Sequence, residues 1–240
     1  MVIIASVTNI ADRVCRLTGL QSTGSERTLI LEYLNDAYRE AVERTECYPK
    51  TSSAISVAAD ASTVTLSSTV TDLNKLLNVY FADYNGYARL KLQPVSHRRM
   101  LDLKDRVNDP VGVPKFYSVV RSGATTTLHL YPSIDSAGTM YVDYYAVPPT
   151  LVESSAGAGE ESTPTAFPTQ FHYRILAAAG IAMALETDQR KDSTPWWDRF
   201  EKGIMDLTAW MNELAGDHKI EPHFSEDYSL GDRDRSRDFG

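Results

Sequence analysis

The stretch Leu34–Ser67, "LNDAYREAVERTECYPKTSSAISVAADASTVTLS", changes its hydrophobic period halfway along. Up to Cys47 the apolar residues recur three and four apart, whereas beyond Pro49 they alternate with Ser and Thr. The first spacing is typical of an amphipathic helix, and the second is typical of a strand. Pro49 separates the two because a proline disfavours the helical conformation of the residue before it, Tyr48. The stretch therefore predicts a helix that ends where a β-rich segment begins.

Two helices are predicted before and within this stretch. The first covers residues 6–18, with Ser6 or Thr8 as its cap and Gly19 at its end. The second starts at Thr23 and Glu26, which have capping-box spacing, and runs to about residue 47. Both carry apolar stripes, so each helix needs a partner to cover it.

The residues after Pro49 predict an antiparallel sheet. Asn85-Gly86 is a strong hairpin signal that joins the β-rich runs Leu77–Phe81 and Tyr87–Leu92. A second hairpin turns at Ser122-Gly123, and the run "GTMYVDYYAVPP" completes a meander or sandwich of about six strands. The run "SHRRMLDLKDR" breaks the alternation and predicts a short helix.

Helical spacing returns after the small and polar loop Glu153–Ala166. A third helix begins at Pro168 and runs to about Thr187, and Thr194 caps a fourth. These helices can cover the first two only if the chain folds back on itself.

The order of elements predicts an α+β fold in which a four-helix bundle carries an inserted β-domain. Two N-terminal and two C-terminal helices form the bundle, the insert is antiparallel, and an extended C-terminal tail follows. The expected boundaries are residues 1–50 and 164–215 for the bundle, 51–163 for the inserted β-rich domain, and 216–240 for the tail.

Composition narrows the class of protein. The chain has 240 residues and a net charge of −8, so it repels DNA phosphates on average. Such a charge argues against a protein that grips DNA and does not exclude one that lets DNA slide past. Cys15 and Cys47 make no disulfide framework and are expected to be reduced thiols. The apolar N-terminus is too short for a signal peptide, and no run reaches the ~18 apolar residues of a membrane span, so no membrane is expected.

No set of residues has the spacing of a catalytic or metal site, so we expect no enzyme and no cofactor. The histidines have no carboxylate or cysteine at zinc spacing. The nearest catalytic pattern is Asp83 with Asp102 and Lys104, which is similar to the core of a Mg²⁺-dependent nuclease. Asp102 falls in a run predicted to be helical rather than a strand, so the nuclease stays an alternative.

Aromatic residues provide candidates for binding surfaces. Tyr131, Tyr141, Tyr144 and Tyr145 lie on predicted strands, and a shared face would make a stacking platform like that of a carbohydrate-binding module. Neighbouring tryptophans in the fourth helix cannot both face its core, so one should point outward. The candidate interface anchors are Trp196, Trp197, Tyr144 and Tyr145.

The segment beyond Gly216 has few apolar residues among charges of both signs. It cannot bury enough apolar surface to fold alone, so we expect it to dock on a partner. The candidate docking residues are Ile220, Phe224, Tyr228, Leu230, Arg233, Arg235, Arg237 and Phe239.

Three stretches resemble the head-to-tail adaptor, or connector, proteins of tailed bacteriophages. They are "LNDAYREAVERTECYP" (Leu34–Pro49), "LYPSIDSAGTMYVDYYAVPPTL" (Leu130–Leu151) and "FPTQFHYRILAAAGIAMALETD" (Phe167–Asp188). The resemblance covers residues 5–214 and rests on the order of elements and loose patterns rather than on an invariant motif. One departure is Tyr48, where members of that family often carry Trp.

The resemblance implies a structural protein of the virion at the head–tail junction, made in the host cytoplasm during assembly. It implies a homo-oligomeric ring, dodecameric in the virion, that sits beneath the portal protein and lets genomic DNA pass through its lumen without specific binding. The implied partners are the portal protein, neck or tail proteins, and further copies of the chain, and the implied role of the tail is portal docking. A neck or tail-terminator protein of the same particle is the alternative.

Overall fold

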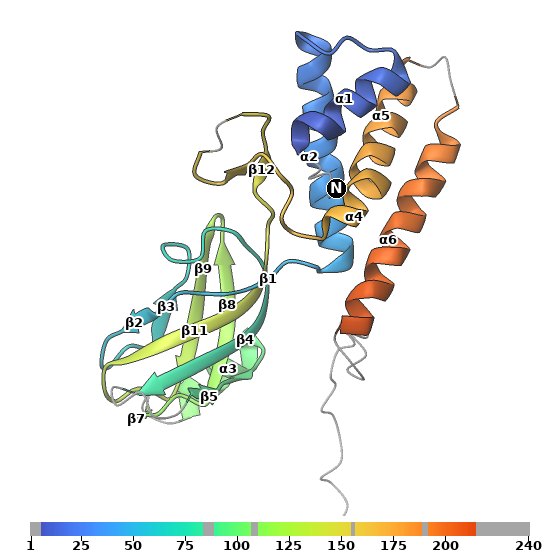
Figure 1. Ribbon diagram of the computed structural model, residues 1–240. Coiled ribbons are helices and arrows are strands. Elements are labelled where there is room, and N and C mark those ends of the chain that lie inside the picture. Colours follow the sequence, from blue (N-terminus) through green and yellow to red (C-terminus); the bar gives the residue numbers. More distant parts are fainter. Residues whose placement is uncertain (1–5, 84–88, 107–109, 155–156, 189–191, 215–240) are drawn as a thin grey trace, which may run out of the picture.

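The computed structural model describes residues 6–83, 89–106, 110–154, 157–188 and 192–214. In these ranges the chain forms a helical part and a β part, which Figure 1 shows side by side. Each part has its own cluster of buried apolar side chains. This arrangement is compatible with the predicted domains, whose residue boundaries stay a prediction.

The helical part combines segments from both ends of the described chain. Its elements are α1 (Val7–Thr18), α2 (Ser25–Thr45), α4 (Thr169–His172), the π-helix η1 (Tyr173–Ala177), α5 (Ala178–Asp188) and α6 (Thr194–Leu214). As predicted, Ser6 caps α1 and Gly19 ends it in the left-handed conformation. The predicted capping box of α2 is wrong, because Gly24 precedes the helix and Glu26 accepts a hydrogen bond from the backbone N–H of Gln21.

The predicted four-helix bundle is wrong. Figure 1 shows α2, α5 and α6 running alongside one another, whereas α1 lies across α2 and α5. The predicted third helix is α4, a π-helical turn and α5 in succession, and a further helix, α3 (His97–Arg106), belongs to the β part. The close contact at Gly180 accounts for the crossing of α1. A Cβ atom there would lie 3.0 Å from Leu34 Cδ2 and 3.3 Å from Val14 Cγ2, so three helices meet at that glycine.

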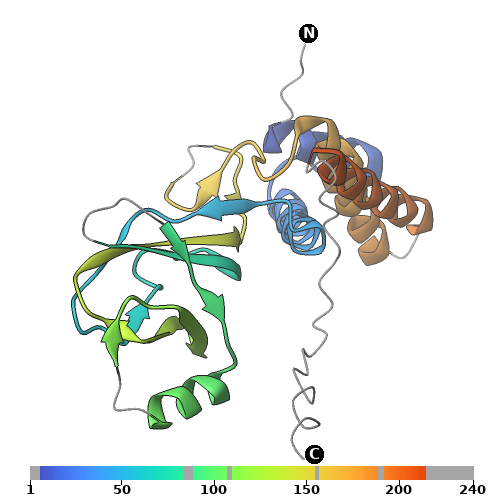
Figure 2. The ribbon, with the colours of Figure 1, turned by 90° about the horizontal axis from the view of Figure 1, so that it is seen from below.

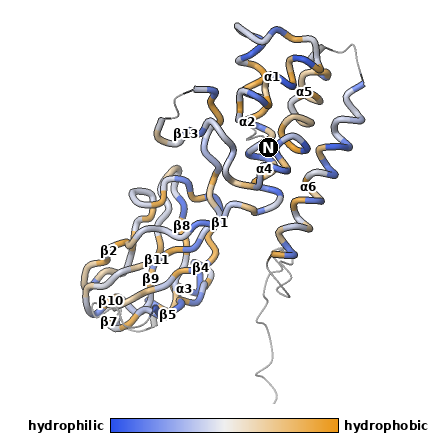
Figure 3. Tube along the Cα trace, in the orientation of Figure 1, coloured by the Kyte–Doolittle hydropathy of each residue, from blue (hydrophilic) through white to orange (hydrophobic). Residues whose placement is uncertain are grey.

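Along α2 and α6, apolar and polar stretches alternate (Figure 3), as expected for helices with one buried face. The buried side of α2 includes Ile30, Leu34 and Ala37, and that of α6 includes Phe200 and Leu207. These side chains belong to one core with residues of α1 and α5. The two ends of the described chain therefore fold as a unit around it.

The β part consists of two main sheets and two short strand pairs. Its strands are β1 (Pro49–Thr51), β2 (Ile55–Val57), β3 (Thr63–Thr65), β4 (Leu73–Asp83), β5 (Arg89–Lys91), β6 (Gln93–Pro94), β7 (Val111–Gly112), β8 (Phe116–Ser122), β9 (Thr125–Tyr131), β10 (Ser133–Ile134), β11 (Gly138–Ala146), β12 (Thr150–Leu151) and β13 (Glu160–Glu161). One sheet has the order β1-β11-β4-β5, with β2 also on β11, and the other has the order β3-β9-β8-β6. Figure 2 shows the strands curving around a shared interior.

The predicted hairpin at Ser122-Gly123 is confirmed, because β8 and β9 pair up to Ser122 and Thr125. The runs on either side of Asn85-Gly86 also pair, as β4 and β5, while that turn lies outside the described residues. The prediction of an entirely antiparallel insert is wrong, because three strand pairs are parallel. They are β6 with β8, β7 with β10, and β12 with β13. Each of these pairs involves two-residue strands, which show no alternation in the sequence.

Helix α2 makes polar contacts along its length with α1, with the segment around β12 and with strand β4. Arg27, which is 7% exposed, forms ion pairs with Asp12 of α1 and with Glu153 beyond β12. In the middle of the helix, the Asn35 side chain exchanges two hydrogen bonds with the backbone of Leu151. Just past its end, Glu46 forms an ion pair with Lys75 of β4 at 2.6 Å. Helix α2 thus contacts the segment around β12, which packs on the helical core through Leu151, at its start and middle, and it contacts a main sheet at its end.

The buried hydroxyl of Tyr38 makes further polar contacts from α2. It donates a hydrogen bond to Glu161 Oε1 at 2.5 Å. It also accepts hydrogen bonds from the backbone N–H groups of Thr165 and Ala166, at 3.1 and 2.9 Å. Burial and the neighbouring carboxylate raise the pKa of Tyr38, so the hydroxyl keeps its proton. One side chain therefore satisfies three groups of the segment that leads back into α4.

Asp72 connects two strands of the β part near the junction. It accepts hydrogen bonds from Lys50 Nζ at 2.7 Å and from the Tyr144 hydroxyl at 2.8 Å. Burial alone would raise the pKa of Asp72, but these two hydrogen bonds outweigh burial and lower it below its ordinary value. Burial and the same hydrogen bond raise the pKa of Tyr144 to about 12.

The lowered pKa of Asp72 predicts a pH-dependent contribution to stability. Because the pKa is lower in the folded chain, the carboxylate stabilises the fold above the unfolded pKa of about 4, and this stabilisation is lost as the pH falls through the folded pKa. Since the pair is partly exposed, Asp72→Asn should lower the free energy of unfolding by about 0.5–1 kcal/mol at pH 7. Urea unfolding of both proteins along a pH series measures this, and a difference that persists unchanged in acid would contradict it.

Candidate interaction site beside the last helix

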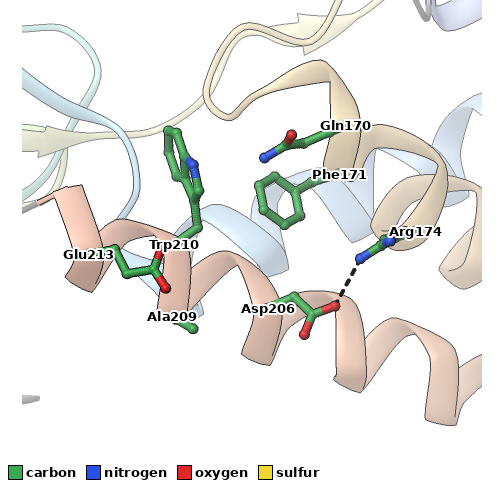
Figure 4. A pocket seen from close by; sticks show the side chains of 7 residues that line it. All are labelled: Gln170, Phe171, Arg174, Asp206, Ala209, Trp210 and Glu213. Carbon is green, nitrogen blue, oxygen red and sulfur yellow. Dashed lines mark hydrogen bonds and ion pairs between the residues drawn. The ribbon is translucent and has the colours of Figure 1, made fainter.

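A groove runs along the helical part between α6 and the segment formed by α4 and the π-helix. Figure 4 shows Gln170, Phe171 and Arg174 on one side and Asp206, Ala209, Trp210 and Glu213 on the other. The rings of Phe171 and Trp210 meet edge to face, with centroids 6.0 Å apart. An ion pair of 3.0 Å between Arg174 Nη1 and Asp206 Oδ2 bridges the groove. The groove thus combines an aromatic base with a charged rim.

The walls of the groove approach closely because α6 carries Gly203 at the contact. A Cβ atom there would lie 2.9 Å from Ile175 Cγ1 and 3.2 Å from the carbonyl oxygen of Arg174. Arg174 and Ile175 belong to the π-helical turn, in which the extra residue widens the backbone toward α6. The turn buries Ile175 and leaves Arg174 exposed at the groove.

The groove continues past the ion pair toward the start of α6. Pro195, Asp198, Arg199 and Lys202 line this second section together with Arg174 and Asp206. Met205 of the same helix is 69% exposed. Aromatic residues, Met and Arg are enriched at protein–protein interfaces. Phe171, Trp210 and Arg174 of the groove are of these kinds, so it is a candidate protein-binding site, although its Asp, Glu and Lys residues are of kinds depleted at interfaces.

The two predicted tryptophan anchors lie at the start of α6, and both are half-buried against the helical core. Trp197 Nε1 donates a hydrogen bond to Glu186 of α5 at 2.5 Å, and its ring meets Phe200 edge to face. The guanidinium of Arg199 lies over the Trp196 ring, 5.7 Å from its centroid. Neither ring points fully outward, contrary to the expectation from their adjacency, and their role as anchors stays a prediction.

The tyrosines considered as a platform do not share one face. Tyr144 is 5% exposed and its hydroxyl binds Asp72 in the interior, so it offers no surface to a partner. Tyr141 and Tyr145 lie on the opposite, outer face of β11, and Tyr131 is on β9 in the other sheet. The alternation of β11 causes this, because neighbouring residues of a strand point to opposite faces.

The residues of the nuclease alternative are also separated by secondary structure. Asp102 and Lys104 lie in α3, whereas Asp83 ends strand β4. Over the described ranges, no three His, Cys, Asp or Glu side chains come close enough to hold a metal ion. The rings of His97 and His129 stack edge to face at 5.4 Å, and His172 Nε2 lies 3.0 Å from the carbonyl oxygen of Phe167.

All predicted docking residues of the tail lie outside the described residues, as do His218 and His223. The groove beside α6 was not predicted from the sequence. Its residues come from two separate segments, and each segment reads only as an amphipathic helix. The i, i+4 pair Asp206 and Trp210 was the one available signal, because it places an acidic and an aromatic side chain on one face of α6.

Within the ranges that the structure describes, no helix is both long and apolar enough to cross a membrane. A family model described as SU10 adaptor protein matches residues 5–219. The matched range includes the helical part, the β part and every residue of the groove. No curated protein matches the chain.

Proposed function

Because this chain belongs to the SU10 adaptor protein family, we propose that it forms a ring beneath the portal protein that joins the capsid to the neck or tail of a phage particle. The family makes the chain a structural phage adaptor and a component of the virion. The ring, which we propose to be a dodecamer, assembles in the host cytoplasm and encloses the path of the DNA. The observation that carries the proposal is the family match over both parts of the chain.

The two-part architecture supports a role between two neighbours. The helical part and the β part have separate cores, so each presents its own outer surface. The ion pair between Glu46 and Lys75 of β4 connects these two parts of the chain. A protein that connects two assemblies needs two such surfaces, and we assign the groove along α6 to contacts with further copies.

The charge of the chain supports passage of DNA without specific binding. A net charge of −8 repels phosphates on average, and repulsion keeps a passing duplex from adhering to the wall of a channel. In this proposal the surface that lines the lumen is mainly acidic.

We assign portal docking to the C-terminal tail. The docking residues are those predicted above, from Ile220 and Phe224 to Arg237 and Phe239. The segment has few apolar residues among charges of both signs, so its apolar anchors need a further surface to cover them. The neck or tail proteins would then meet the β part.

Electron microscopy of the full-length chain mixed with isolated portal rings tests the proposal. Wild-type chain should add a ring of density to one face of the portal. Deletion of residues 220–240 should abolish this density, because the docking anchors are lost. As a matched control, Arg39→Glu alters an exposed charge on α2 and should leave the ring of density on the portal, its decoration, unchanged. Full decoration by the deleted chain would contradict tail docking, and binding to tail tubes instead of portal would identify a terminator protein.

A further inference from the structure

A single exposed segment closes one side of the β part by joining its two sheets. We call it the basic strap and define it as Arg89–Arg99, which comprises β5, β6 and the first turn of α3. The backbone N–H of Leu92 donates to Val79 of β4 at 2.9 Å, and that of Gln93 donates to Lys115 beside β8 at 2.8 Å. In Figure 2 the segment leading into α3 lies along the side of the β part nearer to α6.

The strap lies in the most basic region of an acidic chain. Residues 89–121 contain eight Lys and Arg against three Asp, a net charge of +5. The whole chain carries −8, so the remaining residues together carry −13. This separation of charge indicates an anionic partner for the strap.

The cations of the strap differ from the ion-paired cations elsewhere in the described chain, because they lack a carboxylate partner. Ion pairs of 3.0 Å or less hold Arg27, Arg44, Lys50, Lys75 and Arg174. Among the described residues, no carboxylate forms such a pair with Arg89, Lys91, Arg98, Arg99 or the adjacent Lys115, and all five are exposed. Arg89 lies on the ring of Tyr141, 3.9 Å from its centroid. The strap is therefore a surface of positive charge that this part of the chain does not neutralise.

A neighbouring titratable group is affected by the same positive charge. His129 of β9 stacks on His97 of the strap. Burial lowers the pKa of His129, and the charges of Lys104 and His97 lower it further. Lys104 and His97 thus extend the basic side chains of this region to the edge of the second sheet.

Exposed apolar side chains accompany these cations. Leu90 within the strap is 48% exposed, and Leu101 in the next turn of α3 is 47% exposed. Surfaces that bind nucleic acid are dominated by polar and positive groups, whereas protein interfaces combine Arg with apolar side chains. The mixture favours an acidic protein segment with apolar residues over a phosphate backbone.

The chain itself contains a segment of this composition shortly after α6. Residues 217–232 include five carboxylates and one Lys, a net charge of −4, together with the apolar anchors Ile220, Phe224, Tyr228 and Leu230. Tyr228 lies fourteen positions after Leu214, the end of α6, and this length of chain can span up to roughly 50 Å when extended. A tethered segment also has an effective concentration on the order of millimolar. Reach, charge and apolar content all fit the strap.

We propose that residues 217–232 dock on the basic strap of the same chain when the protein is free. The carboxylates face Arg89, Lys91, Arg98, Arg99 and Lys115, and the apolar anchors cover Leu90 and Leu101. The inference rests on the proposed function in one respect: portal docking of the tail would replace this contact. Release of the tail would then uncover the strap in the assembled particle.

Zero-length carbodiimide cross-linking of the dilute full-length chain, followed by mass spectrometry, tests this contact. The reagent joins a lysine amine to a carboxylate only where the two already touch. We expect cross-links from Lys91 and Lys115 to Glu221, Glu226 or Asp227, with a yield independent of protein concentration. The double variant Arg98→Glu, Arg99→Glu should reduce their yield about fivefold, as expected for two lost charge contacts of about 0.5 kcal/mol each. High salt should reduce it as well.

The matched control reverses two exposed cations of the helical part, Arg16→Glu and Arg39→Glu, and should leave the yield unchanged. Absence of strap–tail cross-links in the wild type, or a yield unaffected by reversal at Arg98 and Arg99, would overturn the proposal. Cross-links between isotopically distinct copies would overturn it in favour of a second copy. Duplex DNA that protects the strap lysines, without any tail cross-link, would overturn it in favour of nucleic acid. Portal decoration is measured separately, so failure of this contact leaves the proposed function intact.

Discussion

Replacing Tyr38 by Phe is expected to lower the free energy of unfolding by about 3 kcal/mol, although it removes a single oxygen atom. That oxygen donates to the buried Glu161 carboxylate and accepts from the backbone N–H groups of Thr165 and Ala166. A hydrogen bond to a charged group is worth more than a neutral one, and the buried Glu161 carboxylate and the buried N–H group of Ala166 would each lose a partner. The melting temperature should fall by about 6–12 °C.

The control for this prediction lies on the same helix. The hydroxyl of Tyr33 bonds to Thr187 Oγ1 at 2.7 Å in an exposed position. Water can replace that partner, so Tyr33→Phe should change the free energy of unfolding by less than about 1 kcal/mol. Thermal and urea unfolding followed by circular dichroism measures both. Equal effects of the two substitutions would show that the Glu161 network contributes nothing beyond an ordinary surface hydrogen bond.

Replacing Arg27 by Met is expected to cost about 2 kcal/mol, because it leaves the buried Oε1 atom of Glu153 without its partner, while water can solvate the exposed Asp12 carboxylate. Arg27 bonds to Asp12, Glu153 and the carbonyl oxygen of Thr8. Met retains much of the apolar stem, so the loss reports on the charge rather than on packing. The contacts come from α1 and from the segment after β12, which makes this side chain a connection among three segments.

Arg44→Met is the matched control, since it removes an ion pair that is open to water. Arg44 binds Glu201 of α6 at 2.6 Å, but its side chain is about as exposed as that of a typical surface residue. Exposed ion pairs are worth about 1 kcal/mol or less. If Arg44→Met destabilised the chain as much as Arg27→Met, burial of Arg27 would not be the source of its effect. Urea midpoints of both variants decide between these outcomes.

Local features of the fold could be predicted from the sequence because they depend on neighbouring residues. Ser6 and Gly19 define the ends of α1, and Ser122-Gly123 defines the turn between β8 and β9. The crossing of α1 over its neighbours could not be predicted. It depends on the contact of Gly180 with Val14 and Leu34, and residues so far apart in the chain share no pattern. The π-helical turn was also missed, because that segment is apolar on nearly all sides and shows no change of period there.

The candidate site shows the same division between local and long-range information. Each wall of the groove was visible as a helix, but the pairing of Arg174 with Asp206 depends on how Gly203 lets α6 approach the π-helix. Tyr144 and Tyr145 were both considered as surface residues, although adjacent residues of a strand must face opposite sides. Their alternation alone shows that at most one can be outward, and the burial pattern of β11 shows that it is Tyr145.

The distribution of contacts along α2 has a mechanical consequence. From Arg27 to Glu46 the helix spans about 28 Å, at 1.5 Å per residue, with attachments to the β side at both ends and in the middle. The first two attachments hold the segment around β12 on the helical core, and the third joins the end of α2 to strand β4. A force applied to the main sheets should therefore enter α2 at its C-terminal end, through Glu46 and Lys75, rather than along its whole length.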